Sequence, residues 1–173
     1  PSVSTRAVPA AEAGPTLTSA EAQSVLDAAV RDRTAGVLPT PAPDGPSLDE
    51  AKSSDKFKAA RDRERVVVAE RKVKFHRVGF HYTSAVTTVL VTEVSGTASR
   101  ATVRFDETGT LFLASDATGP SDVPEQYRIH ATATFLRTDH GWVLDEVLPD
   151  DGPFGLPFSM VDPRLPSDTA GRP

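Results

Sequence analysis

The chain contains no cysteine among its 173 residues. This absence excludes disulfides, thiolate ligands for a metal ion and a cysteine nucleophile. It fits a cytosolic protein as well as a secreted one, so it does not decide the compartment. The sequence also lacks any apolar run that approaches the roughly 18 residues of a membrane-spanning helix, and we expect no membrane span in this chain.

Several common functional motifs are missing as well. The sequence has no G-x-S-x-G elbow, no phosphate-binding loop and no H-E-x-x-H pair, which removes the usual signatures of hydrolases, nucleotide-binding proteins and zinc proteases. Acidic residues outnumber basic ones and the formal net charge is −5, which argues against a nucleic-acid partner. The Lys- and Arg-rich stretch 52–77 is interleaved with acids, as is typical of a solvated helix face.

Proline is scarce in the middle of the chain. Of the 15 prolines, only Pro120 and Pro124 lie between residues 47 and 148. Because proline fixes φ and removes a backbone donor, the ends cannot be long helices or central strands. We therefore predict a flexible leader over 1–15, a single domain over 16–150 and a Pro/Gly-rich tail over 151–173. The apolar residues of 153–162 predict that this part of the tail packs back on the domain or on a partner.

Two helices are predicted in the first half of the domain. Thr18 and Glu21 have the spacing of a capping box, and an apolar stripe at helical spacing follows and ends near Gly36. A second box, Ser47 with Glu50, predicts another helix over 47–72. Residues 73–78 fit either a helix or a strand.

From Phe80 onward the apolar pattern has a period of two, as expected of strands. We predict about five strands in meander order, over 81–96, 99–107, 109–114, 126–137 and 142–148. Helices followed by consecutive strands predict an α+β fold, in which N-terminal helices pack on a curved, cone-like antiparallel β-meander.

The segment Thr138-Asp139-His140-Gly141 first suggests an acid–base site, but a turn explains it better. A short polar segment that ends in glycine between two alternating runs is typical of a hairpin. We therefore place Asp139 and His140 at an exposed tip, where a partner could contact them. The adjacent Trp142 is expected to pack in the core.

The concave side of the sheet is the other candidate site. Four aromatic residues could line a cavity there, namely Tyr82, Phe105, Tyr127 and Trp142, although aromatic side chains at alternating positions more often form a core. If the protein is an enzyme, His81, Asp106 and His130 are its candidate acid–base residues. The four histidines have no spacing that suits a metal site, and we expect neither a metal nor a cofactor.

Part of the sequence resembles a known module. The matching features are the Tyr82-Thr83 start, the run ending at Gly96, the Ala101-Thr102-Val103 strand and the Gly141-Trp142 turn. Over roughly 47–148 they are similar to the nuclear-transport-factor-two-like, or cystatin-like, module of secreted actinobacterial proteins, which often precedes an amidase-like domain. The resemblance implies a cone-shaped fold. Enzymes among these relatives, such as ketosteroid isomerase, use an Asp with a Tyr, and that pair cannot be placed here residue by residue.

The sequence therefore favours a non-catalytic accessory module that binds a protein, a cell-envelope component or a small apolar ligand. The chain begins with proline rather than methionine, and we expect that a signal segment has been removed and that the module works outside the cytoplasm. A weak homodimer through the sheet is a further interpretation. The alternatives are a small cone-fold enzyme with a His/Asp pair, and an inhibitor-like protein that uses the 115–125 loop and the 138–141 tip.

Overall fold

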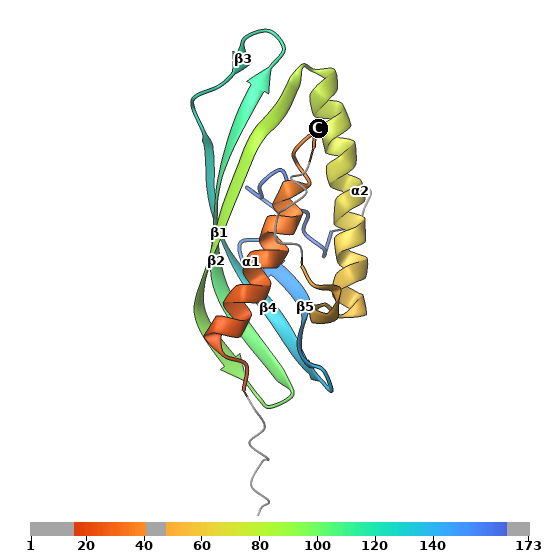
Figure 1. Cartoon of the computed structure of the whole chain (residues 1–173), viewed down its shortest axis with the longest axis vertical. Helices are drawn as coiled ribbons and strands as arrows, with labels where there is room; N and C mark the ends of the chain where they lie inside the picture. The colour runs from red at the N-terminus through yellow and green to blue at the C-terminus, as the bar shows by residue number, and fades with distance from the viewer. Residues whose placement is uncertain (1–15, 41–47, 166–173) are drawn as a thin grey trace, which may run out of the picture.

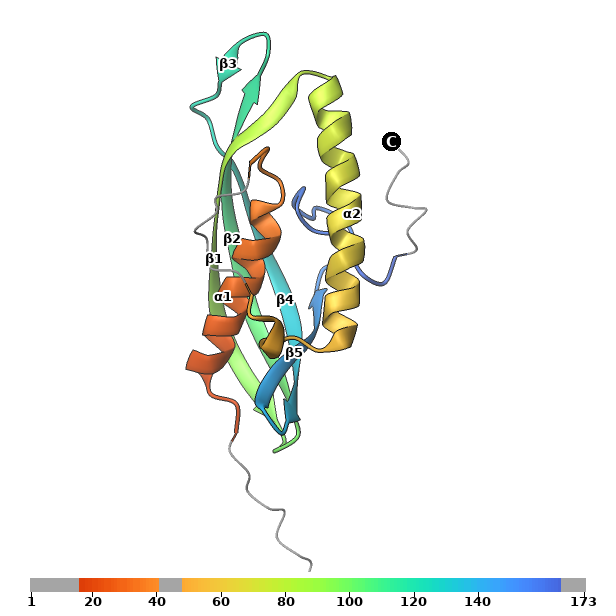
Figure 2. The ribbon, with the colours of Figure 1, turned by 45° about the vertical axis from the view of Figure 1, so that its right-hand side comes forward.

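The computed structural model describes residues 16–40 and 48–165, and the predicted leader over 1–15 lies outside them. It has the expected α+β fold, with two helices on one face of an antiparallel sheet (Figures 1 and 2). The elements are α1 (Ser19–Ala35), the short 3₁₀ turn η1 (Glu50–Lys52), α2 (Asp55–Arg77), β1 (Phe80–Gly96), β2 (Arg100–Ser115), β3 (Gly119–Pro120), β4 (Glu125–Thr138) and β5 (Gly141–Pro149). None of the helices in these ranges is long and apolar enough to cross a membrane.

The sheet is an open meander with the strand order β1-β2-β4-β5, and the two-residue β3 pairs with β2. The strands predicted over 99–107 and 109–114 are in fact one continuous strand, β2. Gly109 at the junction pairs with Tyr127 of β4, whose ring occupies the space where a Cβ of residue 109 would lie. The predicted turn joins β4 to β5, and Gly141 adopts a φ of +108° there, a conformation that glycine adopts without steric cost.

α1 begins and ends where the sequence predicts. Thr18 and Glu21 form the complete capping box, and Gly36 is the C-cap. The apolar stripe of α1 faces the sheet and contributes Ala22, Leu26, Ala29 and Val30 to the main core cluster, together with Val103, Phe105, Phe135 and Leu144 from the strands.

α2 begins later than the prediction of residue 47. Ser47 lies outside the described residues, Glu50 opens only the short turn η1, and α2 begins at Asp55 after the N-cap Ser54. The chain is held out of helical conformation at this point because Ser53 forms a bridge with Leu144, and the Ser54 N–H donates to the Leu144 carbonyl. The ambiguous residues 73–78 resolve as helix as far as Arg77.

Ser54 links the start of α2 to β5, which makes it more than a cap. Its hydroxyl accepts from the Phe57 N–H at 3.1 Å and donates to Asp145 Oδ1 at 2.7 Å. We expect Ser54→Ala to cost about 2 kcal/mol of unfolding free energy, since the buried Asp145 also loses a donor. Thr18→Ala is the matched control: it removes a cap from an exposed helix end and should cost about 1 kcal/mol. Urea unfolding measures both, and equal losses would show that the Asp145 contact adds no stability.

α2 lies over the sheet, with its first turns beside β5 and its last turns leading into β1 (Figures 1 and 2). Of its 23 residues, only Phe57, Arg61 and Val68 are buried. Residues 153–165, which we call the C-terminal strap, supply further contacts. The Arg71 Nη1 donates to the Phe158 and Met160 carbonyls at 2.9 and 3.1 Å, and the Val161 N–H donates to Glu64. The strap therefore holds the middle of α2.

A side chain covers part of the free edge of β1. The Gln23 amide donates to the Val89 carbonyl at 2.6 Å and accepts from the Val91 N–H at 3.0 Å. These are the bonds that a neighbouring strand would make, so α1 occupies this part of the sheet edge and limits edge-to-edge pairing there.

Candidate functional site

Two of the acid–base candidates meet on the sheet. Asp106 and His130 are cross-strand partners on β2 and β4, and His130 Nδ1 lies 2.6 Å from Asp106 Oδ1. Arg128 also pairs with Asp106, and the bonds from Arg128 and His130 hold the pKa of Asp106 below its usual value. The His130 side chain is 54% exposed, so nothing desolvates it as a general base would require.

His81 is not part of this pair. It lies opposite Ala114 near the start of β1, whereas Asp106 lies opposite Leu90 farther along the same strand. The structure therefore brings together Asp106 and His130 and leaves His81 apart. Among the described residues, no group of three or more His, Asp or Glu side chains could hold a metal ion.

The four aromatic candidates do not share one cavity. Phe105 and Trp142 are buried in the main core cluster. Tyr82 belongs to a second cluster, against which Tyr127 packs. Asp139 and His140 lie exposed in the turn between β4 and β5.

A buried polar cluster links α1 to β2 and β4, and its residues were not among the predicted sites. Arg33 of α1 forms an ion pair with Glu107 of β2, with 6% and 1% of their side chains exposed. The Tyr127 hydroxyl donates to the same carboxylate oxygen, Glu107 Oε1, at 2.7 Å. The sequence pattern indicates that two of these charged residues face the core. Glu107 continues the inward alternation of Ala101, Val103 and Phe105 on β2. Arg33 continues the apolar stripe of α1.

The protonation states of this cluster follow from its surroundings. Burial acts to lower the pKa of Arg33, but the Glu107 and Glu64 carboxylates outweigh it and raise that pKa above its ordinary value. Burial and the Glu107 carboxylate raise the pKa of Tyr127. Arg33 therefore stays charged and Tyr127 remains a hydroxyl donor at neutral pH. Arg33 and the Tyr127 hydroxyl thus both bind Glu107 Oε1, and this set joins α1, β2 and β4 beneath the surface.

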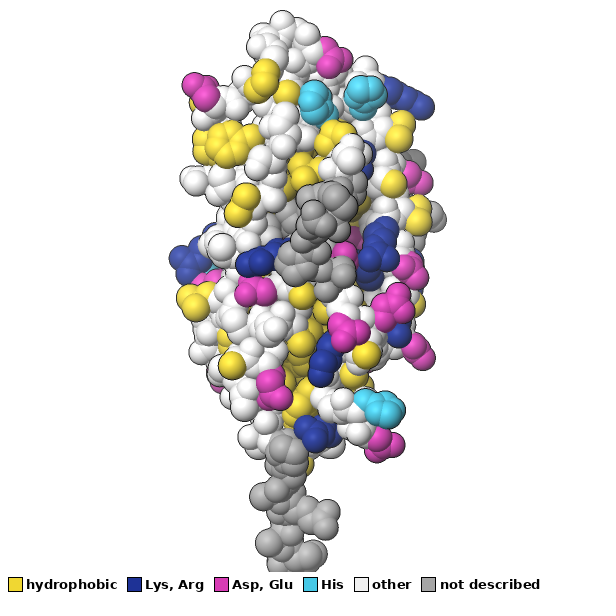
Figure 3. Space-filling model, viewed as in Figure 1, with side chains coloured by type: hydrophobic (Ala, Val, Ile, Leu, Met, Phe, Trp, Pro, Cys, Tyr) yellow, Lys and Arg dark blue, Asp and Glu magenta, His cyan; other side chains and the backbone are white. Residues whose placement is uncertain are grey.

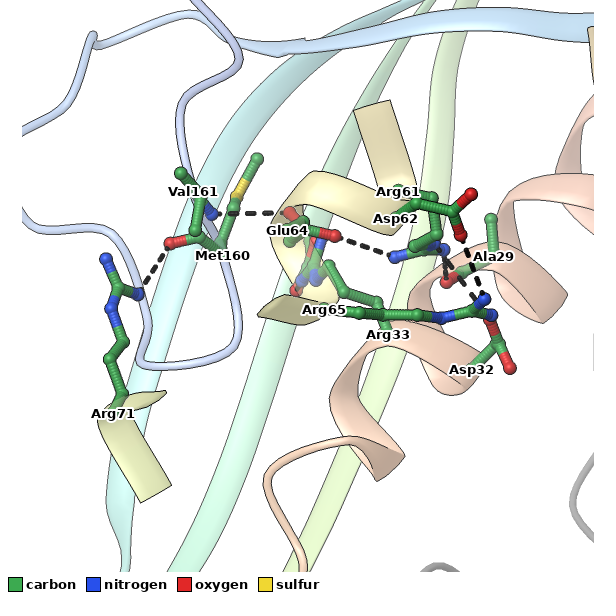
Figure 4. A network of polar contacts seen from close by, with 11 residues as sticks. Ala29, Asp32, Arg33, Arg61, Asp62, Glu64, Arg65, Arg71, Met160 and Val161 are labelled. Carbon is green, nitrogen blue, oxygen red and sulfur yellow. Dashed lines mark hydrogen bonds and ion pairs between the residues drawn. The ribbon is translucent and has the colours of Figure 1, made fainter. Parts of the chain in front are cut away.

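A second polar layer joins α1 to α2 and to the strap (Figure 4). The buried Arg61 donates to the Ala29 carbonyl and to Glu64 Oε1, and its guanidinium lies over the Phe57 ring. Glu64 in turn accepts from the strap at Val161. Polar side chains thus span the distance between the two helices where apolar contacts are few.

A large cavity lies beside this layer, beneath α2. It has a volume of about 740 Å³, is partly open to solvent and is lined by α1, α2, β5 and the strap. Its apolar wall includes Leu26, Val30, Phe57, Ala60, Val67, Val147, Leu156 and Met160. Charged side chains also line it, namely Arg33, Lys56, Arg61, Arg63, Glu64, Arg71, Asp145, Glu146 and Asp162. The volume lies within the range of about 300–1,000 Å³ that small-molecule sites occupy.

Comparisons with known proteins name no family for this chain. No family model matches it, and no curated protein matches it. Among solved structures, the crystal structure of the intermembrane space region of the chloroplast protein ARC6 is similar to it. That likeness covers 78% of this chain and 98% of the other, with a TM-score of 0.49 and 11% identity. A likeness this distant carries no argument about function.

Proposed function

We propose that this domain is a non-catalytic binding module that holds a small, mostly apolar ligand in the cavity beneath α2. The observation that supports it is the cavity itself, which has the volume of a small-molecule site and an apolar wall set among charged side chains. In line with the resemblance in its sequence, we place the module outside the cytoplasm as an accessory to another protein or domain.

The attachment of α2 agrees with this role. A helix held by polar contacts and by a strap can shift without disrupting the main core, because its own apolar burial is limited to Phe57 and Val68. Regions with little apolar burial open at low free-energy cost, so α2 and the strap provide a route for the ligand.

The catalytic alternative depends on the His130–Asp106 contact. Because the neighbouring Phe105 and Ala131 face the core, Asp106 and His130 lie on the other face of the sheet, with 13% and 54% of their side chains exposed. The buried Glu107 is already held by Arg33 and Tyr127. A binding role accounts for the cavity without requiring either group to react.

Filling the cavity tests the proposal. Ala60 lines the cavity and its neighbour Ala59 is exposed on the same helix. With the neutral fluorescent dye N-phenyl-1-naphthylamine as the probe, we expect the wild-type chain and Ala59→Phe to bind alike. Ala60→Phe should bind at least about tenfold more weakly, a difference of about 1.4 kcal/mol, because the added ring occupies the ligand space.

Circular dichroism of both variants establishes that they fold. If the wild-type chain does not enhance the dye fluorescence, or if Ala60→Phe binds as well as Ala59→Phe, the cavity is not the site. The proposed function would then be wrong.

A further inference from the structure

A separate groove lies where α2 runs into β1. It has a volume of about 630 Å³ and lies between the last turns of α2, the chain just after α1 and the start of β1. In Figure 3, apolar and histidine side chains gather at the upper end of the molecule, where α2 and β1 meet in Figure 1.

Aromatic side chains form the floor of this groove. Phe75 packs against Phe80 and Tyr82, with ring centroids 5.6 and 5.4 Å apart. Val37 completes the floor from the end of α1, and it belongs with Tyr82 to the second core cluster. Val73 lines the groove while 52% exposed, so an apolar strip remains open to solvent on an otherwise charged helix.

Apart from the Tyr82 hydroxyl, the polar side chains that line the groove are basic or imidazole groups. Lys72, His76, Arg77 and His81 line it, and none of the described lining residues is a carboxylate. The Lys72 ammonium donates to the Leu38 carbonyl at 2.8 Å and retains further donors. Outside the lining residues, the Glu125 carboxylate accepts from the Tyr82 hydroxyl at 2.9 Å, and the Asp116 carboxylate lies beside Gly79.

This charge is unusual for the molecule as a whole. The chain carries a net charge of −5, yet the charged side chains that line this groove, Lys72 and Arg77, are both basic. A rim of one sign beside an apolar floor is complementary to a ligand with an apolar chain and an opposite charge at one end.

We propose that this groove binds a single-chain anionic amphiphile. The acyl chain lies on Phe75, Phe80 and Val73, and the carboxylate or phosphate head contacts Lys72 and Arg77. The site is distinct from the cavity beneath α2, so it stands or fails independently of the proposed function.

Comparing ligands that differ only in the head group tests this site. By calorimetry below micellar concentrations, we expect the chain to bind dodecanoate and dodecyl phosphate at least about tenfold more tightly than dodecan-1-ol, the factor given by one charge-assisted hydrogen bond. The same preference should hold in Ala60→Phe, in which the cavity is filled. If dodecan-1-ol binds as tightly as dodecanoate and dodecyl phosphate, the groove does not recognise an anionic head group and the proposal is wrong.

Variants on the last turns of α2 locate the head group. Lys72→Gln with Arg77→Gln should reduce dodecanoate affinity at least about tenfold, while leaving dodecan-1-ol binding unchanged. Lys74→Gln is the control, because Lys74 is exposed in the same turn and does not line the groove. An equal loss in Lys74→Gln would show that the basic residues act only through their overall charge.

The same measurements separate a soluble ligand from a membrane surface. Sedimentation with anionic phospholipid vesicles, without binding of dodecanoate or dodecyl phosphate in solution, would assign this region to membrane contact and would overturn the proposal.

Discussion

Replacing Glu107 with leucine should lower the unfolding free energy by about 3–5 kcal/mol, the usual cost of leaving one partner of a buried ion pair alone. Only 6% of the Arg33 side chain is exposed, so the unpaired guanidinium would be poorly hydrated. The Tyr127 hydroxyl would lose its acceptor as well. Equilibrium unfolding in urea measures the loss.

The double variant Arg33→Met/Glu107→Leu distinguishes the ion pair from a simple packing role. With both charges removed, apolar side chains of similar size can fill the space, and a buried pair replaced in this way is often close to neutral. We expect the double variant to recover most of the stability lost in Glu107→Leu. If its loss of unfolding free energy equals the sum of the losses in the two single variants, the two charges do not compensate each other and this explanation is wrong.

Gly109→Ala should lower the unfolding free energy by about 1–3 kcal/mol, the range for overpacking a filled site. A Cβ at this position would overlap the ring and hydroxyl of Tyr127. The ring would have to move, and its hydroxyl would leave Glu107. The substitution thus also disturbs the buried polar cluster. Thermal unfolding gives the size of the effect.

Tyr127→Ala provides the control for this clash. In that background the ring is absent, so Gly109→Ala should cost much less than it does in the wild-type chain, and the two substitutions should be non-additive as contacting residues usually are. Full additivity would mean that Gly109 is required for a reason other than the Tyr127 ring.

The α+β fold could be predicted because its main signals are local. The capping box at Thr18 and Glu21 and the stripe that follows place α1, and the β-branched alternation after Phe80 places the strands. The turn at residues 138–141 could be predicted for the same reason, since a polar segment that ends in glycine has few other conformations.

The errors arise where a distant segment overrides a local signal. Ser47 with Glu50 matches a capping box, but Ser53 and Ser54 pair with Leu144, which is remote in sequence. Gly109 suggests a strand break, but the ring of Tyr127 takes the place of its missing side chain. Neither partner is visible from the residues nearby.

The candidate sites also divide into features that follow from local sequence and features that depend on distant segments. The His130–Asp106 contact follows from strand pairing, yet its position on the uncovered face depends on which side the helices pack. The cavity and the groove are formed by segments that are far apart in the chain. Single lining residues such as Tyr82 and His81 could be predicted from the sequence, but the other segments that form the groove with them could not.

The strap also affects the order in which the domain can be completed. Arg71 contacts Phe158 and Met160 across 87 and 89 residues, and Glu64 contacts Val161 across 97. During synthesis from the N-terminus, these bonds cannot form until the last part of the domain has left the ribosome. The meander can pair strand by strand before then, because its strands are neighbours in the sequence. The middle of α2, although it is made before any strand, therefore lacks these contacts until synthesis of the domain is nearly over, and the cavity beneath it is completed only then.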